Sequence, residues 1–226
     1  MGKRQEIRNK REKQAKRQKL IVLVSVIIVS LLITSFVIYQ SQKPIGEIKL
    51  LEEKTRPETN GLTMGNPEAQ IVVEEFSDFQ CIACYRFWLN FEQDFIDRYV
   101  SIGDVLFQYV PFSFIGNESF QAAEAAYCAE EQGRFWDYHD MLFLNWDGEN
   151  VGNFSDRRLV AFAGELGLDE NSFESCLKSN KYNDDVQEGL RYGRSLGVNA
   201  TPTFSVNGKI VFGDTLFATI DELLEK

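Results

Sequence analysis

The chain has 226 residues, of which 44% are hydrophobic and 26% are charged, and this composition excludes a largely disordered protein. Its net charge of −10 hides a strong asymmetry. Residues 1–19 contain nine Lys or Arg and two Glu, a net charge of +7, which leaves −17 for residues 20–226. We expect these two parts to face different environments.

The segment Leu20–Tyr39 follows the basic tail and contains no charged residue, Gly or Pro. As a helix that rises about 1.5 Å per residue, it would span the roughly 30 Å hydrocarbon core of a bilayer. A cleaved signal peptide is the alternative, although such peptides have small residues near the cleavage site and this chain has bulky ones at Phe36–Gln40. We predict an uncleaved signal anchor in the cell membrane. The positive-inside rule then places residues 1–19 in the cytoplasm and everything after Tyr39 outside.

The basic tail could instead bind nucleic acid, as runs of Lys and Arg do. Its position directly before the apolar segment favours a role in membrane topology and in contact with anionic lipid. We therefore expect a membrane-anchored protein with no nucleic-acid partner.

A polar linker is predicted over residues 40–60, which contain Pro44 and Pro57 and one short strand at Glu47–Leu51. The folded domain is expected over residues 61–226. The length leaves room for one or two domains, and one domain with a helical insertion accounts for these residues without a second core.

The domain begins with a strand, a helix and a second strand. Ile71–Phe76 is predicted to be a short buried strand, and Asp104–Val110 is predicted to be the next one. Between them the apolar residues recur at helical spacing, so Cys81 is expected at the junction between the first strand and a helix. The buried face of this helix is predicted to consist of Cys84, Phe87, Trp88, Phe91, Phe95 and Tyr99.

A helical block of about residues 117–196 follows the second strand. It is read as an insertion of five helices: Phe120–Gln132, Phe135–Phe143, a helix capped by Ser155 that runs to Leu166, a helix capped by Asp169, and Tyr182–Leu196.

The chain ends with a hairpin and a helix. Asn207-Gly208 lies between the apolar runs Thr203–Val206 and Lys209–Phe212 and is typical of a tight hairpin turn. Asp214–Glu225 is predicted to be the last helix. This order predicts an α/β fold in which a parallel strand pair adjoins an antiparallel edge, with helices on both faces.

Cys81 and Cys84 lie one helical turn apart at the predicted helix start. Free backbone N–H groups and the helix dipole stabilise a thiolate there and lower thiol pKa values to roughly 3.5–7.5. The pair is therefore predicted to be a redox-active dithiol, in which one thiolate attacks and the other resolves the mixed disulfide. A short structural disulfide is the alternative. Zinc would need a second ligand pair, and we expect no metal because Cys128, Cys176 and His139 each stand alone.

Cys128 and Cys176 fall on two different helices of the insertion. A domain outside the cytoplasm can form disulfides, and we expect a structural disulfide between these two residues. Two buried free thiols are the alternative.

Three stretches together resemble the DsbA-like branch of the thioredoxin superfamily: Glu75–Cys84 (EFSDFQCIAC), Gln132–His139 (QGRFWDYH) and Val198–Gly208 (VNATPTFSVNG). The resemblance covers residues 62–226. It implies a thioredoxin-like fold with an all-helical insertion and the activity of a thiol–disulfide oxidoreductase.

The resemblance also assigns roles to residues. Cys81 corresponds to the exposed attacking cysteine and Cys84 to the buried resolving one. Pro202 corresponds to the cis-proline of the family, and Thr201 before it to the residue that faces the dithiol and pairs with substrate backbone. Glu75 matches the buried acid that handles protons for the resolving thiol, and its neighbour Glu74 is expected on the other face of the strand.

Ile82-Ala83 departs from the family pattern, in which Pro-His or Pro-Ser lies between the cysteines of strong oxidants. Neither residue offers a cation or side-chain donor to Cys81, which argues for a milder oxidant, but Ile82 keeps a backbone N–H that proline lacks. The sequence therefore leaves the preferred direction of electron flow open.

We predict an extracytoplasmic enzyme that introduces disulfides into reduced exported proteins at Cys81 and Cys84. By resemblance it would be a monomer without a cofactor, reoxidised by a quinone-linked membrane protein of the DsbB or VKOR type. A reductase or isomerase with the same site is one alternative. A membrane-anchored domain that binds clients without turnover is another.

Overall fold

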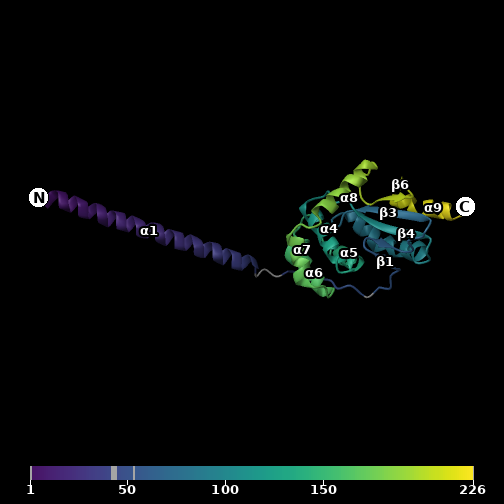
Figure 1. The fold of residues 1–226 in the computed structure, drawn as a ribbon, viewed down its shortest axis with the longest axis horizontal. Helices are drawn as coiled ribbons and strands as arrows, with labels where there is room; N and C mark the ends of the chain where they lie inside the picture. Colours follow the sequence, from purple (N-terminus) through teal and green to yellow (C-terminus); the bar gives the residue numbers. More distant parts are fainter. Residues whose placement is uncertain (1, 42–44, 53, 226) are drawn as a thin grey trace. The chain divides into compact units, whose positions relative to one another are not determined.

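The computed structural model describes residues 2–41, 45–52 and 54–225, and the chain divides into two units. The first unit, up to Gly46, is built from one long helix, α1 (Gly2–Ser41) (Figure 1). Between Lys16 and Phe36 this helix is long and apolar enough to cross a membrane, and none of that stretch is buried in the protein. The predicted anchor, Leu20–Tyr39, overlaps this stretch.

The second unit, from Glu47 onward, is built on a six-stranded sheet within the described residues, in the order β1-β2-β4-β3-β5-β6. β3 and β4 pair in parallel, whereas β5 runs antiparallel to β3. The predicted α/β arrangement, a parallel pair beside an antiparallel hairpin, is thereby confirmed. The strands are β1 (Thr59–Asn60), β2 (Thr63–Met64), β3 (Ile71–Ser77), β4 (Val105–Pro111), β5 (Thr203–Val206) and β6 (Lys209–Val211).

The central strand β3 sends alternate side chains to opposite faces of the sheet. Glu75 lies on one face, level with Tyr109 of β4 and Phe204 of β5 in the strand register. Glu74 lies on the other face, as expected, and its carboxylate accepts a hydrogen bond from the Tyr192 hydroxyl of α8 (Asn183–Ser195) at 2.8 Å. Phe76 on this second face is packed in a separate apolar cluster that includes Leu190 and Val198.

The helical segment after β3 differs from the predicted regular helix. It consists of α2 (Ile82–Phe87), a π-helical turn η1 (Trp88–Glu92), α3 (Gln93–Phe95) and a second π-helical turn η2 (Ile96–Val100). Because a π turn contains an additional residue, it shifts the buried face along the sequence. Phe91 was therefore wrongly predicted to be buried: its side chain is 55% exposed, while Glu92 is only 3% exposed.

The helical insertion follows the prediction closely, and Figure 1 shows its helices grouped together in the domain. Asp169 caps α7 by accepting the Ser172 N–H at 2.8 Å, whereas the Ser155 side chain makes no such bond to α6. The predicted and observed ends differ by at most three residues. The helices besides α8 are α4 (Asn117–Glu130), α5 (Phe135–Leu144), α6 (Asp156–Glu165), α7 (Glu170–Lys178) and the final α9 (Gly213–Leu224).

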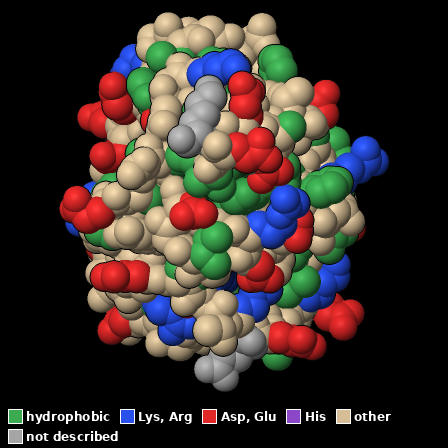
Figure 2. Space-filling view, turned by 90° about the vertical axis from the view of Figure 1, so that its right-hand side faces the viewer, with side chains coloured by type: hydrophobic (Ala, Val, Ile, Leu, Met, Phe, Trp, Pro, Cys, Tyr) green, Lys and Arg blue, Asp and Glu red, His purple; other side chains and the backbone are tan. Residues whose placement is uncertain are grey.

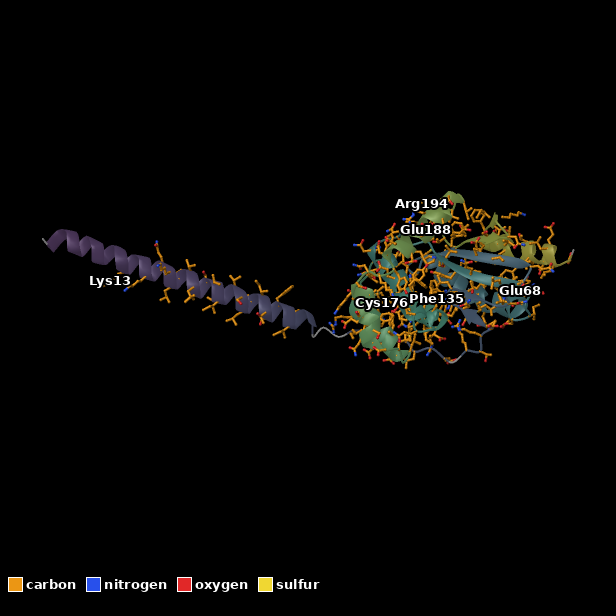
Figure 3. All side chains as sticks on the ribbon, in the orientation of Figure 1. Lys13, Glu68, Phe135, Cys176, Glu188 and Arg194 are labelled. Carbon is orange, nitrogen blue, oxygen red and sulfur yellow. A yellow bond between two sulfur atoms is a disulfide. The ribbon has the colours of Figure 1, made fainter. Side chains whose placement is uncertain are left out.

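A disulfide joins Cys128 of α4 to Cys176 of α7, with the two Cα atoms 5.9 Å apart. Figure 3 labels Cys176 in the folded domain. The bonded residues are 48 positions apart in the sequence. The bond therefore closes a loop that contains α5, α6 and parts of α4 and α7.

The segment before β1 packs against the domain, in contrast to the linker expected over residues 40–60. The Lys49 N–H donates to Asn145 Oδ1 at 2.8 Å, and Asn145 Nδ2 donates back to the Lys49 carbonyl at 3.0 Å. Ile48 and Leu51 pack against the core, and residues 45–52 form no strand. The linker prediction is thus wrong from Glu47 onward, because a side-chain amide and apolar contacts fix this backbone. Residues 42–44 and 53 of the predicted linker lie outside the described residues.

Acidic side chains are spread over the face of the molecule shown in Figure 2, with basic and hydrophobic side chains between them. This agrees with the net charge of −17 carried by residues 20–226. The nine basic residues of the tail lie within residues 1–19, before the apolar segment.

Candidate active site

Cys81 is positioned by the loop that connects β3 to α2. Asp78 fixes this loop, because its carboxylate accepts the N–H groups of Gln80 at 2.9 Å and of Phe114 at 2.9 Å. Cys81 then takes an extended backbone conformation as the N-cap of α2. Its side chain therefore lies at the free N–H groups of the helix start, where a negative charge is stabilised.

The two thiols differ in exposure and in acidity. Cys81 is 8% exposed and Cys84 is fully buried. The pKa of Cys81 is lowered from 9.0 to about 6, chiefly by a hydrogen bond from Cys84. Burial opposes this shift, whereas Thr201 and the backbone N–H groups of Cys84 and Ala83 add to it. Burial raises the pKa of Cys84 well above its usual value. Cys81 is thus a thiolate at neutral pH, whereas Cys84 holds a proton.

Glu75 is buried in β3, on the same side of the sheet as Cys84. Burial raises its pKa from 4.5 to about 8, with a further rise from the charge of Cys81 and an opposing effect of Ser77. Its charge contributes to the raised pKa of Cys84. The acid is therefore protonated at neutral pH, and it lies within electrostatic range of the resolving thiol.

The loop before β5 forms the wall opposite Cys81. The peptide bond between Thr201 and Pro202 is cis. When Cys81 is protonated, its S–H can donate to the Thr201 carbonyl oxygen, which lies 3.4 Å from Sγ. The structure thus brings together Cys81, Cys84, Glu75, Thr201 and Pro202 from three parts of the sequence: β3, the start of α2 and the loop before β5.

A groove of about 800 Å³ opens beside Ala83 and Pro202. Its lining combines residues from the helix after Cys81, the Thr201–Pro202 loop and α9. Its apolar lining is Ala83, Phe87, Phe91, Pro202 and Phe217, and its charged residues are Arg86, Asp94, Arg98 and Asp214. This groove was not predicted, because no local pattern in the sequence links these segments and because Phe91 was expected in the core.

The thioredoxin family model matches residues 58–226, about three quarters of the chain. The chain belongs to the thioredoxin family. The predicted resemblance and fold are confirmed by this match and by the solved structures that resemble the domain.

The proteins that are similar to this chain include disulfide bond formation proteins. Disulfide bond formation protein D of Bacillus subtilis is 27% identical over 170 residues, which cover 72% of this chain and 75% of that protein. The oxidised crystal structure of BdbD from the same organism has a TM-score of 0.69 at 24% identity, with 76% and 97% of the two chains covered. That likeness establishes the fold.

A second group of similar proteins consists of much longer chains. The Na(+)/H(+) antiporter NhaA 3 of Salinispora tropica is 30% identical over 145 residues, 64% of this chain. The chain spans only about a fifth of the length of that antiporter. The similarity therefore concerns one part of the antiporter chain.

The lowered pKa of Cys81 in this thioredoxin-family site predicts a pH dependence of its reactivity. In the reduced protein, the rate of Cys81 alkylation by iodoacetamide should rise with pH around a midpoint of about 6. The pKa of Cys81 is lower in the folded than in the unfolded protein, so ionisation of this thiol stabilises the reduced fold. This contribution to stability is complete above about pH 9 and is lost as the pH falls through about 6. A midpoint near 9, as in an unfolded control, would contradict the assigned environment.

Proposed function

We propose that this protein is a membrane-anchored thiol–disulfide oxidoreductase that introduces disulfides into exported proteins. The observation that carries the proposal is the asymmetric cysteine pair: Cys81, 8% exposed and with a lowered pKa at a helix start, and the fully buried Cys84 within electrostatic range of the protonated Glu75. The family match and the named disulfide bond formation proteins support it.

The proposed reaction begins with the Cys81–Cys84 disulfide. A substrate thiolate attacks Cys81 Sγ, the Cys81–Cys84 bond breaks, and its electron pair leaves on Cys84 Sγ, which takes a proton from Glu75. The second substrate thiolate then attacks the substrate sulfur of the mixed disulfide, and Cys81 leaves as a thiolate. The substrate is oxidised by two electrons, and the enzyme dithiol is reduced.

The lowered pKa of Cys81 supports the direction of this reaction. Stabilising the thiolate stabilises the reduced enzyme, and a stabilised reduced form makes the disulfide a stronger oxidant. Backbone and side-chain donors at the helix start supply this stabilisation even though Ile82-Ala83 offers no side-chain donor.

Substrate would bind along the Thr201–Pro202 loop and the adjacent groove. The groove offers apolar rings, among them Phe87, Phe91 and Phe217, with charged residues beside them. It suits an extended segment of an unfolded chain whose apolar side chains have not yet been buried.

For location, we propose a tail of residues 1–19 in the cytoplasm, an anchor at 20–39 and the catalytic domain outside the membrane. The apolar surface of α1 supports an anchor or signal segment. Reduced exported proteins would be the substrates. A quinone-linked membrane protein of the DsbB or VKOR type would reoxidise a monomeric enzyme.

The test of the direction is the redox state of Cys81 and Cys84 in living cells. Acid quenching followed by alkylation with a mass-tagged maleimide should show the pair mostly as a disulfide. A reductase or isomerase keeps the pair mostly reduced. The absence of a cation between the two cysteines would be compatible with such an enzyme. A mostly reduced pair in unstressed cells would therefore overturn the oxidase assignment.

A further inference from the structure

Glu92 is buried where a regular helix would bury Phe91. The π turn η1 (Trp88–Glu92) turns this acid into the core and leaves the phenylalanine 55% exposed. Burial of an acid costs free energy unless the group is paired, yet Glu92 Oε2 has no hydrogen-bond partner among the described residues. π turns frequently occur at functional sites. This exchange of an apolar for an acidic group therefore calls for a functional explanation.

The imidazole of His139 on α5 faces this acid. Its Nε2 lies 3.8 Å from Glu92 Oε2 and has no hydrogen-bond partner among the described residues. Its Nδ1 lies 3.1 Å from Asp140 Oδ1. Because a carboxylate accepts only, Nδ1 carries the ring proton and Nε2 presents its lone pair to Glu92. Burial raises the pKa of Glu92 and lowers that of His139, so the pair is a protonated acid beside a neutral base.

Asp140 connects this pair to the surface. Its Oδ2 lies 2.9 Å from Lys54 Nζ and 2.6 Å from Arg56 Nη2, and the Lys54 side chain is 39% exposed. Burial alone would raise the pKa of Asp140, but the hydrogen bond from His139 and the charges of Arg56 and Lys54 lower it overall. An ionised group thus lies between the buried imidazole and a solvent-exposed cation.

At its inner end the pair approaches the dithiol. The charge of Glu75 raises the pKa of Glu92, so the two acids lie within electrostatic range of each other. Tyr109, level with Glu75 in the strand register, packs edge-on against the His139 ring with centroids 5.2 Å apart. Glu75 Oε2 and the Tyr109 hydroxyl also lack a hydrogen-bond partner among the described residues. Buried polar groups of this kind are usually satisfied by ordered water, which also bridges them.

We propose that Glu92 and His139 form a proton path between Glu75, beneath the resolving thiol of Cys84, and the surface at Asp140 and Lys54. The inference rests on the dithiol exchange at Cys81 and Cys84 proposed above. When the disulfide opens, Cys84 takes a proton from Glu75, and Glu75 takes one from Glu92. Glu92 then takes a proton from Nε2 of His139 while Nδ1 takes one from the solvent side at Asp140, so the ring ends with its proton on Nδ1, as in the structure with free thiols. When the disulfide forms again, the proton leaves Cys84 by the same groups in reverse order. No electron passes along the path.

A metal ion is a poorer explanation of the same cluster. Ligand atoms of Glu92, His139 and Asp140 lie within 4.8 Å of one another. Both oxygens of Asp140 are already engaged, one by the Trp88 indole N–H at 2.8 Å and the other by Lys54 and Arg56. Two cations at this carboxylate oppose the binding of a third.

The test measures the opening of the Cys81–Cys84 disulfide in the oxidised full-length chain mixed with excess dithiothreitol. Tryptophan fluorescence reports the reaction, because the Trp146 indole donates to the Gln80 carbonyl directly before Cys81. Glu92→Gln and His139→Gln should each slow the opening at neutral pH roughly tenfold, since each removes a proton carrier. The double variant Glu75→Gln/Glu92→Gln should be no slower than Glu75→Gln, because the groups act in series.

Glu124→Gln is the matched control. Glu124 is also a buried acid, but it lies on α4 and accepts a hydrogen bond from Asn183 of α8. This variant should react at the unmodified rate and show the unmodified solvent isotope effect in heavy water. The path variants should change that isotope effect. If Glu92→Gln does not fold, as judged by thermal unfolding, His139→Gln decides by the same criteria.

Path variants that match Glu124→Gln in rate and isotope effect would overturn the proton path and leave the dithiol chemistry intact. Additive losses for Glu75→Gln and Glu92→Gln would also overturn it, since groups in series do not add. An unmodified disulfide that dithiothreitol cannot open would overturn both this inference and the proposed function. The three results are distinguishable in one set of stopped-flow traces.

Discussion

The Cys81→Ser variant should lose the ability to form disulfides in a reduced test protein, with a fall in rate of roughly 10³-fold or more. Of the two thiols, Cys81 is the more exposed, 8% against 0% for Cys84, and it is the one whose pKa is lowered. Serine keeps the size of the side chain but cannot form the mixed disulfide. The assay follows the return of activity in a reduced test enzyme, with oxidised full-length protein as the oxidant.

Cys84→Ser is the companion variant for this assay. It keeps the attacking thiol but removes the resolving one, so it should accumulate a mixed disulfide with the test protein that is visible on a non-reducing gel. Refolding that proceeds equally well with Cys81→Ser would contradict the enzyme and support a domain that binds clients without turnover.

Replacement of both Cys128 and Cys176 by serine should lower the free energy of unfolding by about 4 kcal/mol. The two bonded cysteines are 48 positions apart in the sequence. In the chain-entropy model, closing a loop of this length lowers the entropy of the unfolded chain and stabilises the folded state by about 4 kcal/mol. Urea unfolding of the oxidised full-length protein, followed by tryptophan fluorescence, measures the difference.

The matched control for this pair is Ser175→Ala beside Cys176, which leaves the disulfide intact and should change the unfolding free energy little. At a temperature at which the double variant is folded, its Cys81 should still react with a substrate disulfide. An unchanged unfolding free energy in the double variant would show that the cross-link contributes no stability.

Local patterns in the sequence predicted the α/β order of strands and helices, and the resemblance to the DsbA-like branch supplied the thioredoxin-like fold. The apolar run before Cys81 and the helical spacing after it placed the cysteine at a strand–helix junction, where the structure has it. Asn207-Gly208 marked the hairpin between β5 and β6. These features depend on short-range turn chemistry and side-chain period, which a single sequence displays directly.

Features that depend on three-dimensional packing were not predicted. The period of the helix after Cys81 indicated a buried Phe91, and nothing local signalled the π turns that bury Glu92 instead. His139 was read as an isolated histidine, because its neighbour Glu92 lies 47 positions earlier in the sequence. The segment at Lys49 was interpreted as a linker, because its partner Asn145 lies 96 positions later in the sequence.

The most direct test of the central claim is the reduction potential of the Cys81–Cys84 couple in the full-length protein in detergent. Equilibration with defined glutathione or dithiothreitol buffers, followed by acid quenching and alkylation, gives the fraction oxidised at each potential. We expect a value above that of thioredoxin, about −270 mV, and below that of DsbA, about −120 mV, because the Cys81 pKa of about 6 lies between the values of about 7 in thioredoxin and about 3.5 in DsbA. A value near about −270 mV would contradict an enzyme that introduces disulfides.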